Sequence, residues 1–297
     1  MKLKIFIIIF LTLISCRKVI DLNLPKQEQS LVVNSNLILD SFIKINLSLT
    51  QGITENTANY NINNAIVSIY DSDTNLIEVL QNGGNGTYFS NSLKGLSNKK
   101  YLARIINQNK IYWATDSIPL MANTILMDTA RILYQGKPNY FNIEYKMIDN
   151  QIQTNYYGLK IKRYFKQFQK INNIPDTINK EEWINIDTRD FILTENEITQ
   201  FSKQHLLFND RFFKNISRNI KFGNHNILNT INQKTTSLII YLEQYSPQAF
   251  EYYHTLNEHL FYQNDPFSQP SLVKGNIQNA YGAFIGKSIK ADTIKFN

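Results

Sequence analysis

Apolar and polar residues alternate with a period of two over much of the chain, beginning at Leu31. The clearest stretch is 43–50, in which isoleucine or leucine alternates with a polar residue, as a half-buried strand requires. Further short runs of this kind occupy 65–70, 76–80, 87–89, 101–106 and 111–115. Such runs, separated by turn residues at intervals of about ten residues, are typical of an all-β sandwich. We therefore predict a β-sandwich domain over residues 31–120.

The remainder, 121–297, has a less regular pattern that also favours strands, so we predict a second β-rich domain. Its expected strands are 129–134, 141–147, 157–163, 183–191, 216–222, 238–242, 281–285 and 288–296. The polar stretch 173–182 reads as a long surface loop, and 194–206 as one or two helical turns.

One α-helix is strongly marked near 246–263. Ser246 is a favourable N-cap and Pro247 occupies the first helical position, which proline tolerates because its missing N–H needs no partner there. Apolar residues then recur at helical spacing until Asp265-Pro266, where the residue before proline is disfavoured in a helix.

The first sixteen residues have the pattern of an export signal. Lys2 and Lys4 precede an apolar run, 5–14, interrupted by one threonine. About twenty apolar residues are needed to cross a bilayer, so this run predicts a signal peptide at 1–15 and not a membrane span. Its end resembles a bacterial lipobox, in which Cys16 is lipidated, for example with palmitate, and becomes the new N-terminus. Residues 16–30 then form a tether. The alternative is a soluble secreted protein with a chance cysteine.

Composition narrows the classes of function. The formal net charge is +7, and it falls to +5 when cleavage of the signal peptide removes Lys2 and Lys4. The remaining basic residues are scattered along the chain, which argues against a nucleic-acid partner. The chain has one cysteine, so disulfides are not expected.

Candidate chemical motifs are incomplete, and we predict no catalytic residues, no metal and no cofactor. Gly282–Ser288 is one residue short of a phosphate-binding loop and reads as a turn before the last strand. Asp71–Asn75 begins like a calcium loop but lacks its glycine and glutamate, and reads as a β-turn. Glu251 and His254 share a helix face without the second pair that a di-metal site needs.

A basic and aromatic stretch runs through 156–165, where Lys160, Lys162 and Arg163 lie among tyrosines and a phenylalanine. It would suit a binding surface. Lysines on the solvent face of an edge strand, which prevent pairing with other chains, are the simpler interpretation.

The chain also resembles a known family. The segments that carry the resemblance are 19–25, 31–34, 63–71, 84–88, 101–105, 207–213, 246–256, 265–270 and 275–286. They resemble, in order, a Bacteroidetes lipoprotein family known as domain of unknown function 4249. The resemblance implies an outer-membrane lipoprotein, often encoded beside TonB-dependent receptors and without established enzyme activity, whose first half is an immunoglobulin/prealbumin-like β-sandwich. The face of the membrane stays open, because Arg17 and Lys18 replace the acidic residues that usually follow the lipidated cysteine of surface-exposed relatives.

Two sets of surface residues are candidates for recognition and modification. Loops on a rigid scaffold often carry binding residues. We therefore predict a recognition loop within 265–286, formed by Asp265, Pro266, Phe267, Pro270, Asn276, Asn279, Gly282 and Gly286. Four Asp-Ser or Asp-Thr pairs resemble the O-glycosylation acceptor of exported Bacteroidetes proteins, at Ser117, Thr129, Thr177 and Thr293. In each set, ordinary turn residues are an equally good explanation.

We therefore expect a lipid-anchored outer-membrane protein that serves as a non-enzymatic accessory or ligand-binding subunit of a TonB-dependent uptake system. One rival is a surface hydrolase of glycans or peptides, which needs two carboxylates in one cleft. The available carboxylates are Glu144, Glu181, Glu182, Asp187, Asp190 and Glu243. Another rival is a structural or adhesive envelope lipoprotein.

Overall fold

The structure is a computed structural model. It describes residues 28–52, 60–134, 137–148, 153–171, 174–188, 202–224, 232–263 and 271–296, with single positions at 190, 193, 265 and 267–269. The predicted signal peptide at 1–15, Cys16 and most of the tether lie outside the described residues.

Strands make up most of the molecule, as the alternation predicted, and they form three sheets. The largest sheet has nine strands, and its main path runs in the order β12-β11-β15-β16-β1-β2-β6-β5, with β13 paired to β11. Its strands are β1 (Leu31–Ile38), β2 (Phe42–Leu49), β5 (Gln81–Gly84), β6 (Thr87–Lys94), β11 (Tyr156–Ile171), β12 (Ile174–Trp183), β13 (Leu206–Asn209), β15 (Gln233–Tyr245) and β16 (Tyr281–Lys295).

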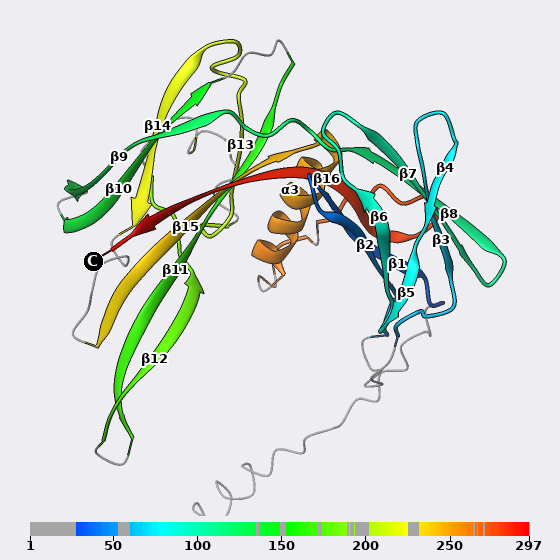
Figure 1. Cartoon of the computed structure of the whole chain (residues 1–297), viewed down its shortest axis with the longest axis horizontal. Coiled ribbons are helices and arrows are strands. Elements are labelled where there is room, and N and C mark those ends of the chain that lie inside the picture. The colour runs from blue at the N-terminus through cyan, green and yellow to red at the C-terminus, as the bar shows by residue number, and fades with distance from the viewer. Residues whose placement is uncertain are drawn as a thin grey trace, which may run out of the picture.

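Two smaller sheets pack against this large one, at opposite ends (Figure 1). The first contains β3 (Ile66–Tyr70), β4 (Leu76–Val79), β7 (Lys100–Asn107) and β8 (Lys110–Ser117). The second contains β9 (Thr124–Tyr134), β10 (Lys137–Ile148) and β14 (Ser217–Asn224). The molecule is thus two β-sandwiches that share one long sheet.

The N-terminal sandwich matches the prediction from its alternating strands. Val33, Ile45, Ile69 and Tyr101 point inward from the two sheets and are fully buried. Phe284 of β16 joins the same core, although it lies close to the end of the chain. The first sandwich is therefore completed by the last strand.

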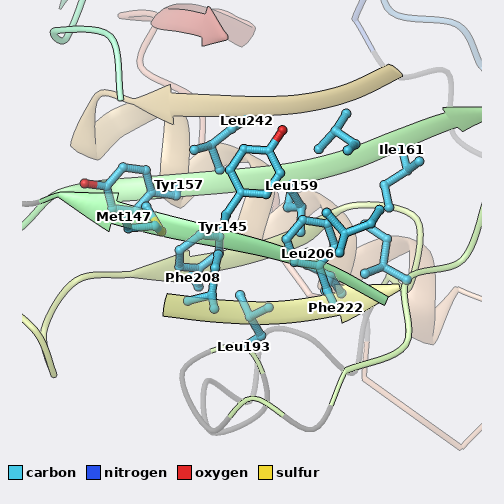
Figure 2. Close-up of a cluster of buried hydrophobic side chains, with 14 of the residues drawn as sticks. Tyr145, Met147, Tyr157, Leu159, Ile161, Leu193, Leu206, Phe208, Phe222 and Leu242 are labelled. Carbon is cyan, nitrogen blue, oxygen red and sulfur yellow. The ribbon is translucent and has the colours of Figure 1, made fainter. Parts of the chain in front are cut away.

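The C-terminal sandwich has its own core between β10 and β14 on one side and β11, β13 and β15 on the other (Figure 2). Tyr145 and Phe222 stack with ring centroids 5.8 Å apart, and Tyr157 and Phe208 do so at 5.2 Å. Side chains alternate along each strand, so those on one face of the large sheet fill this core and those on the other face point away from it.

The predicted helix is confirmed as α3 (Pro247–Tyr262), with Ser246 as its N-cap. The Ser246 hydroxyl accepts a hydrogen bond from the Ala249 N–H at 3.0 Å. Ala249 and Phe250 pack onto the outer face of the large sheet beside Ala283 and Ile285. The helix therefore covers the point where the two sandwiches meet (Figure 1).

β16 links the two halves by pairing parallel to β1 and antiparallel to β15. The expected turn at Gly282–Ser288 is wrong, because β16 runs through it without a break. Its glycines are needed for close packing instead: a Cβ at Gly286 would lie 2.0 Å from the Ser117 carbonyl oxygen. Gly282 has a φ of +93° and lies against the Val33 carbonyl, which excludes a side chain. The predicted domain boundary at residue 120 stays a prediction, although the pairing of β1 with β16 joins strands from its two sides by hydrogen bonds.

The surface loop expected at 173–182 is also wrong, because these residues form most of β12. β12 and the end of β11 make a long hairpin that extends from the body of the molecule (Figure 1). Both faces of β12 meet solvent, so its sequence is largely polar and lacks a regular alternation. The strand ends at Trp183, and the strand expected to continue through 191 is not seen in the described part of that range.

Candidate functional site

The first part of the predicted recognition loop lies at the surface beyond α3. The Asp265 carboxylate accepts hydrogen bonds from the Phe267 N–H at 3.0 Å and the Ser268 hydroxyl at 2.6 Å, which fixes a tight turn. Phe267 is 96% exposed. Pro266 and Pro270 lie outside the described residues.

The second part of that loop has a structural role in the described fold. The Asn276 side chain accepts a hydrogen bond from the Phe284 N–H at 2.8 Å and donates to the Phe284 carbonyl at 2.6 Å. Asn279 has a φ of 61° in the turn that leads into β16. Together with Gly282 and Gly286, these residues set the path of β16.

A groove of about 650 Å³ runs between α3 and residues 271–274. Tyr156 and Phe250 line it, with ring centroids 4.7 Å apart. His254 and Glu258 of α3 line the same groove, and Lys274 closes one side through an ion pair with Glu251 at 2.6 Å. Within the described ranges, no group of three or more histidine, cysteine, aspartate or glutamate side chains is placed to hold a metal.

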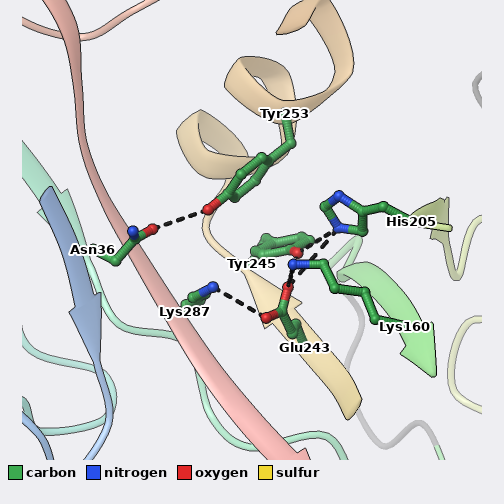
Figure 3. A network of polar contacts seen from close by, with 7 residues as sticks. All are labelled: Asn36, Lys160, His205, Glu243, Tyr245, Tyr253 and Lys287. Carbon is green, nitrogen blue, oxygen red and sulfur yellow. Dashed lines mark hydrogen bonds and ion pairs between the residues drawn. The ribbon is translucent and has the colours of Figure 1, made fainter. Parts of the chain in front are cut away.

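A buried polar network lies under α3, on the outer face of the large sheet (Figure 3). Glu243 of β15 is its centre: one carboxylate oxygen lies 3.0 Å from the Lys287 ammonium and the other 3.1 Å from the Lys160 ammonium. The Tyr245 hydroxyl donates to the same carboxylate, and His205 contacts that hydroxyl at 2.8 Å. The three charged side chains come from β11, β15 and β16, so the network ties together the strands that α3 covers.

Burial decides which members of this network carry charge. Burial alone raises the pKa of Glu243, but the ammonium groups of Lys287 and Lys160 outweigh it and lower that pKa to about 2. Burial lowers the pKa of His205 to about 3, and Lys160 adds to the effect, so the imidazole is neutral at pH 7. Burial also lowers the pKa of Lys160 although Glu243 opposes it. The network therefore contains one carboxylate, two ammonium groups and a neutral histidine.

The network extends through the ring of Tyr253 on α3. The Lys160 and Lys287 ammonium groups each lie 5.8 Å from the centroid of this ring, which is the arrangement of a cation–π contact. The Tyr253 hydroxyl donates to the Asn36 side chain of β1 at 2.9 Å. One tyrosine thus joins the helix to strands of both sandwiches.

A second buried acid, Asp116, connects the N-terminal sandwich to α3. Its carboxylate accepts hydrogen bonds from the Ser246 hydroxyl at 2.5 Å and the Gly286 N–H at 2.7 Å. Burial raises the pKa of Asp116 to about 6, although these donors lower it in part. Asp116 therefore holds the helix N-terminus against the end of β8.

The four candidate glycosylation residues lie in different settings. Thr177 and Thr293 are exposed on strands of the large sheet, whereas Ser117 and Thr129 are half-buried. Three of the partner aspartates accept a hydrogen bond from the following N–H, as at Asp176, where the distance is 2.8 Å. Glycosylation at these positions stays a prediction.

The carboxylates considered for a hydrolase are distributed over the molecule. Glu144 is on the outer face of the three-stranded sheet and Glu243 is on the outer face of the large sheet, so the C-terminal core separates them. Most members of the set have a cationic partner: Glu144 pairs with Lys221, Glu181 with Lys162, Glu182 with Arg163, Asp190 with Arg218, and Glu243 with Lys160 and Lys287.

The sequence marks Lys160 as part of a basic stretch and Glu243 as an available carboxylate, but it does not show that the two side chains meet. The available signal was the alternation itself, since Glu243 and Lys287 each break the apolar side of a strand. Their pairing depends on the register of strands that are far apart in the chain, which local patterns do not encode.

Among the described residues, no helix is both long and apolar enough to cross a bilayer. A search of proteins with curated functions finds no match to the chain. A family model, described as a domain of unknown function (DUF4249), matches residues 17–292. That match covers both sandwiches, α3 and nearly all of β16, and the chain therefore belongs to the family of domain of unknown function 4249.

Proposed function

We propose that this protein is a lipid-anchored, non-enzymatic binding subunit of the outer membrane that works with a TonB-dependent receptor in nutrient uptake. The observation that carries the proposal is the segment 1–16, in which a charged head and a short apolar run end at the one cysteine of the chain. Acylation at Cys16 would hold the body of the protein at a membrane through the residues that precede β1.

Two features of the described fold support a binding role over a hydrolytic one. The carboxylates Glu144 and Glu243 face away from each other across the C-terminal core, whereas a glycosidase needs its pair about 5–10 Å apart in one cleft. The shared sheet, held by α3 and the Glu243 network, is a rigid support for a recognition surface.

Labelling with radioactive palmitate tests the anchor. We expect the full chain to incorporate label and to sediment with outer membranes, and Cys16→Ser to do neither. A protein that takes up no label, or a Cys16→Ser variant that still sediments with outer membranes, would contradict the proposed anchoring.

Purification from gently solubilised membranes tests the partner. A receptor barrel should co-purify with the lipidated protein and be recovered in repeated preparations. Recovery of the lipoprotein alone would count against the transport role, and hydrolysis of glycans or peptides by the purified protein would favour the enzymatic alternative.

A further inference from the structure

β11 carries lysine and aromatic side chains on one face of a strand that lies inside the large sheet. Tyr157 and Ile161 point into the C-terminal core, so Lys160, Lys162 and Tyr164 point to the opposite face. The expectation that these lysines protect a sheet edge is wrong, because β11 lies between β12 and β15. Their position needs another explanation.

Neighbouring strands extend this surface. Trp183 of β12 is the cross-strand partner of Lys162, and Tyr241 of β15 is the partner of Lys160. The rings of Trp183 and Tyr241 lie 5.6 Å apart at an angle of 57°. We name the surface formed by Lys162, Tyr164, Lys166, Trp183 and Tyr241 the open face; Lys160 marks its border with the network under α3.

Large aromatic groups on the open face meet solvent. Trp183 is 43% exposed, and Phe168, farther along the same face of β11, is 44% exposed. The Lys162 ammonium lies 5.3 Å from the Trp183 ring and 5.7 Å from the Tyr164 ring. Aromatic rings flanked by ammonium groups present an apolar surface and a positive charge to the same ligand.

The charges on the open face are poorly arranged for stability alone. Lys166 of β11 lies directly opposite Lys234 of β15, and both side chains are exposed. Like charges that face each other across two strands destabilise the pair. A bound anion would remove this repulsion.

We propose that the open face binds an acidic polysaccharide, whose pyranose rings stack on Trp183 and Tyr241 and whose carboxylates pair with Lys162 and Lys166 of β11. This inference rests on the proposed binding function and names its class of ligand. The C–H groups on one side of a pyranose form an apolar surface that matches an aromatic ring, and its hydroxyl groups need hydrogen-bonding partners.

A carboxylate on the open face favours an acidic sugar over a nucleic acid or a polyacidic peptide. Glu181 pairs with Lys162 at 2.6 Å, so one of the open-face lysines is already partly neutralised. A nucleic acid gains most of its affinity from cations that neutralise its phosphates, and this ion pair weakens that contribution. A sugar chain also offers hydroxyl groups, which donate hydrogen bonds to an exposed carboxylate such as Glu181.

Tryptophan fluorescence reports directly on this surface, because the chain has two tryptophans. The other one, Trp113, lies on β8 of the N-terminal sandwich beside Tyr70. In Trp113→Phe, Trp183 is the one remaining tryptophan. Titration of this protein with tetragalacturonate should give a saturable change in emission, and the neutral tetrasaccharide maltotetraose should bind at least roughly tenfold more weakly.

Two variants separate binding from folding. In the Trp113→Phe background, Lys166→Glu should weaken tetragalacturonate binding roughly tenfold while leaving the unfolding midpoint unchanged or higher, because it replaces a repulsive pair with an attractive one. Lys44→Glu on β2 makes the same change of charge at an exposed position of the N-terminal sandwich. This control variant should bind tetragalacturonate as tightly as the Trp113→Phe protein does.

Three results would overturn the proposal: no change in Trp183 emission up to about 1 mM tetragalacturonate, equal losses in Lys166→Glu and Lys44→Glu, or tighter binding of oligothymidylate or polyglutamate than of tetragalacturonate. Palmitate labelling and receptor co-purification are independent of this titration. Failure of the anchor or the partner is therefore distinguishable from failure of the ligand class.

Discussion

The outer face of the large sheet differs between its two ends: one end is covered by α3 and the other is open to solvent. Strands β11 and β15 run through both ends. At the covered end, small residues such as Gly158 and Ala283 allow close packing, and α3 lies over Tyr245 and the Glu243 network. At the open end, the same strands carry Lys162 and Tyr241 beside the half-exposed Trp183.

The comparison separates a structural region of this surface from the region that we propose for recognition. Under α3 the charges are buried, and each has a partner because an unpaired buried charge is costly. On the open face the charges stay in water, where an ion pair adds little stability and leaves the lysines available for a ligand. Changes at the covered end should therefore affect folding, and changes at the open end should affect binding.

The largest expected effect is the loss of the Glu243 carboxylate. Glu243→Gln leaves the Lys160 and Lys287 ammonium groups without a counter-charge in a largely buried position. We expect a loss of about 3 kcal/mol in the free energy of unfolding, measured by urea denaturation. The same substitution at the open end, Glu181→Gln, should leave the midpoint unchanged; equal losses in the two variants would break the distinction between the ends.

Acidification should weaken the covered end through His205. Its pKa is about 3 in the folded protein against an ordinary value of 6.5, so the unfolded chain binds a proton that the folded protein excludes. This contribution to stability is complete above pH 6.5 and is lost at about 1.4 kcal/mol per pH unit as the pH falls toward 3.

Comparison of wild type and His205→Gln at pH 7 and pH 4.5 isolates this effect from the titration of other groups. The variant should lose less stability between the two pH values, by about 2.7 kcal/mol. Identical pH profiles for the two proteins would show that the imidazole is not buried in its neutral form.

Close packing at the covered end makes Gly158 sensitive. A Cβ at this position would lie 2.6 Å from the Tyr245 ring and 2.8 Å from His205 Nε2, so Gly158→Ala must displace the network. We expect the free energy of unfolding, measured by thermal denaturation, to fall by about 2 kcal/mol. A variant as stable as wild type would mean that the sheet accommodates a side chain there and that the packing under α3 is loose.

The smallest expected effect on stability lies at the open end. Trp183→Ala removes a side chain that is already 43% exposed at an edge strand, so the free energy of unfolding, measured by urea denaturation, should change by less than about 1 kcal/mol. A larger loss would indicate that Trp183 is a packing residue, and the open face would then need no ligand to explain it.

The sequence predicted those parts of the fold that depend on local chemistry. Ser246 and Pro247 define the start of α3, and the alternation in β1, β2 and β7 defines the first sandwich. β12 was missed because an exposed hairpin has no buried face and therefore no period. The unbroken path of β16 was missed because its glycines are explained by contacts with Ser117 and Val33, which are remote in the chain.

The candidate sites depend on distant contacts in the same way, and their assignment from the sequence stays a prediction. The segment beyond α3 was chosen by its turn residues, and the described fold uses Asn276 and Gly282 to position β16. The lysines and aromatic residues of β11 are evident in the sequence, but an interior strand and an edge strand have the same sequence pattern. Only the sheet order separates the two interpretations.

Hydrogen–deuterium exchange of the full chain, with and without tetragalacturonate, compares the two ends in one measurement. We predict that the ligand slows exchange in 162–168, 177–183 and 235–241 and leaves α3 and residues 271–274 unchanged. Slower exchange confined to α3 and 271–274 would place the ligand in the groove beside the helix and would contradict the assignment of recognition to the open face.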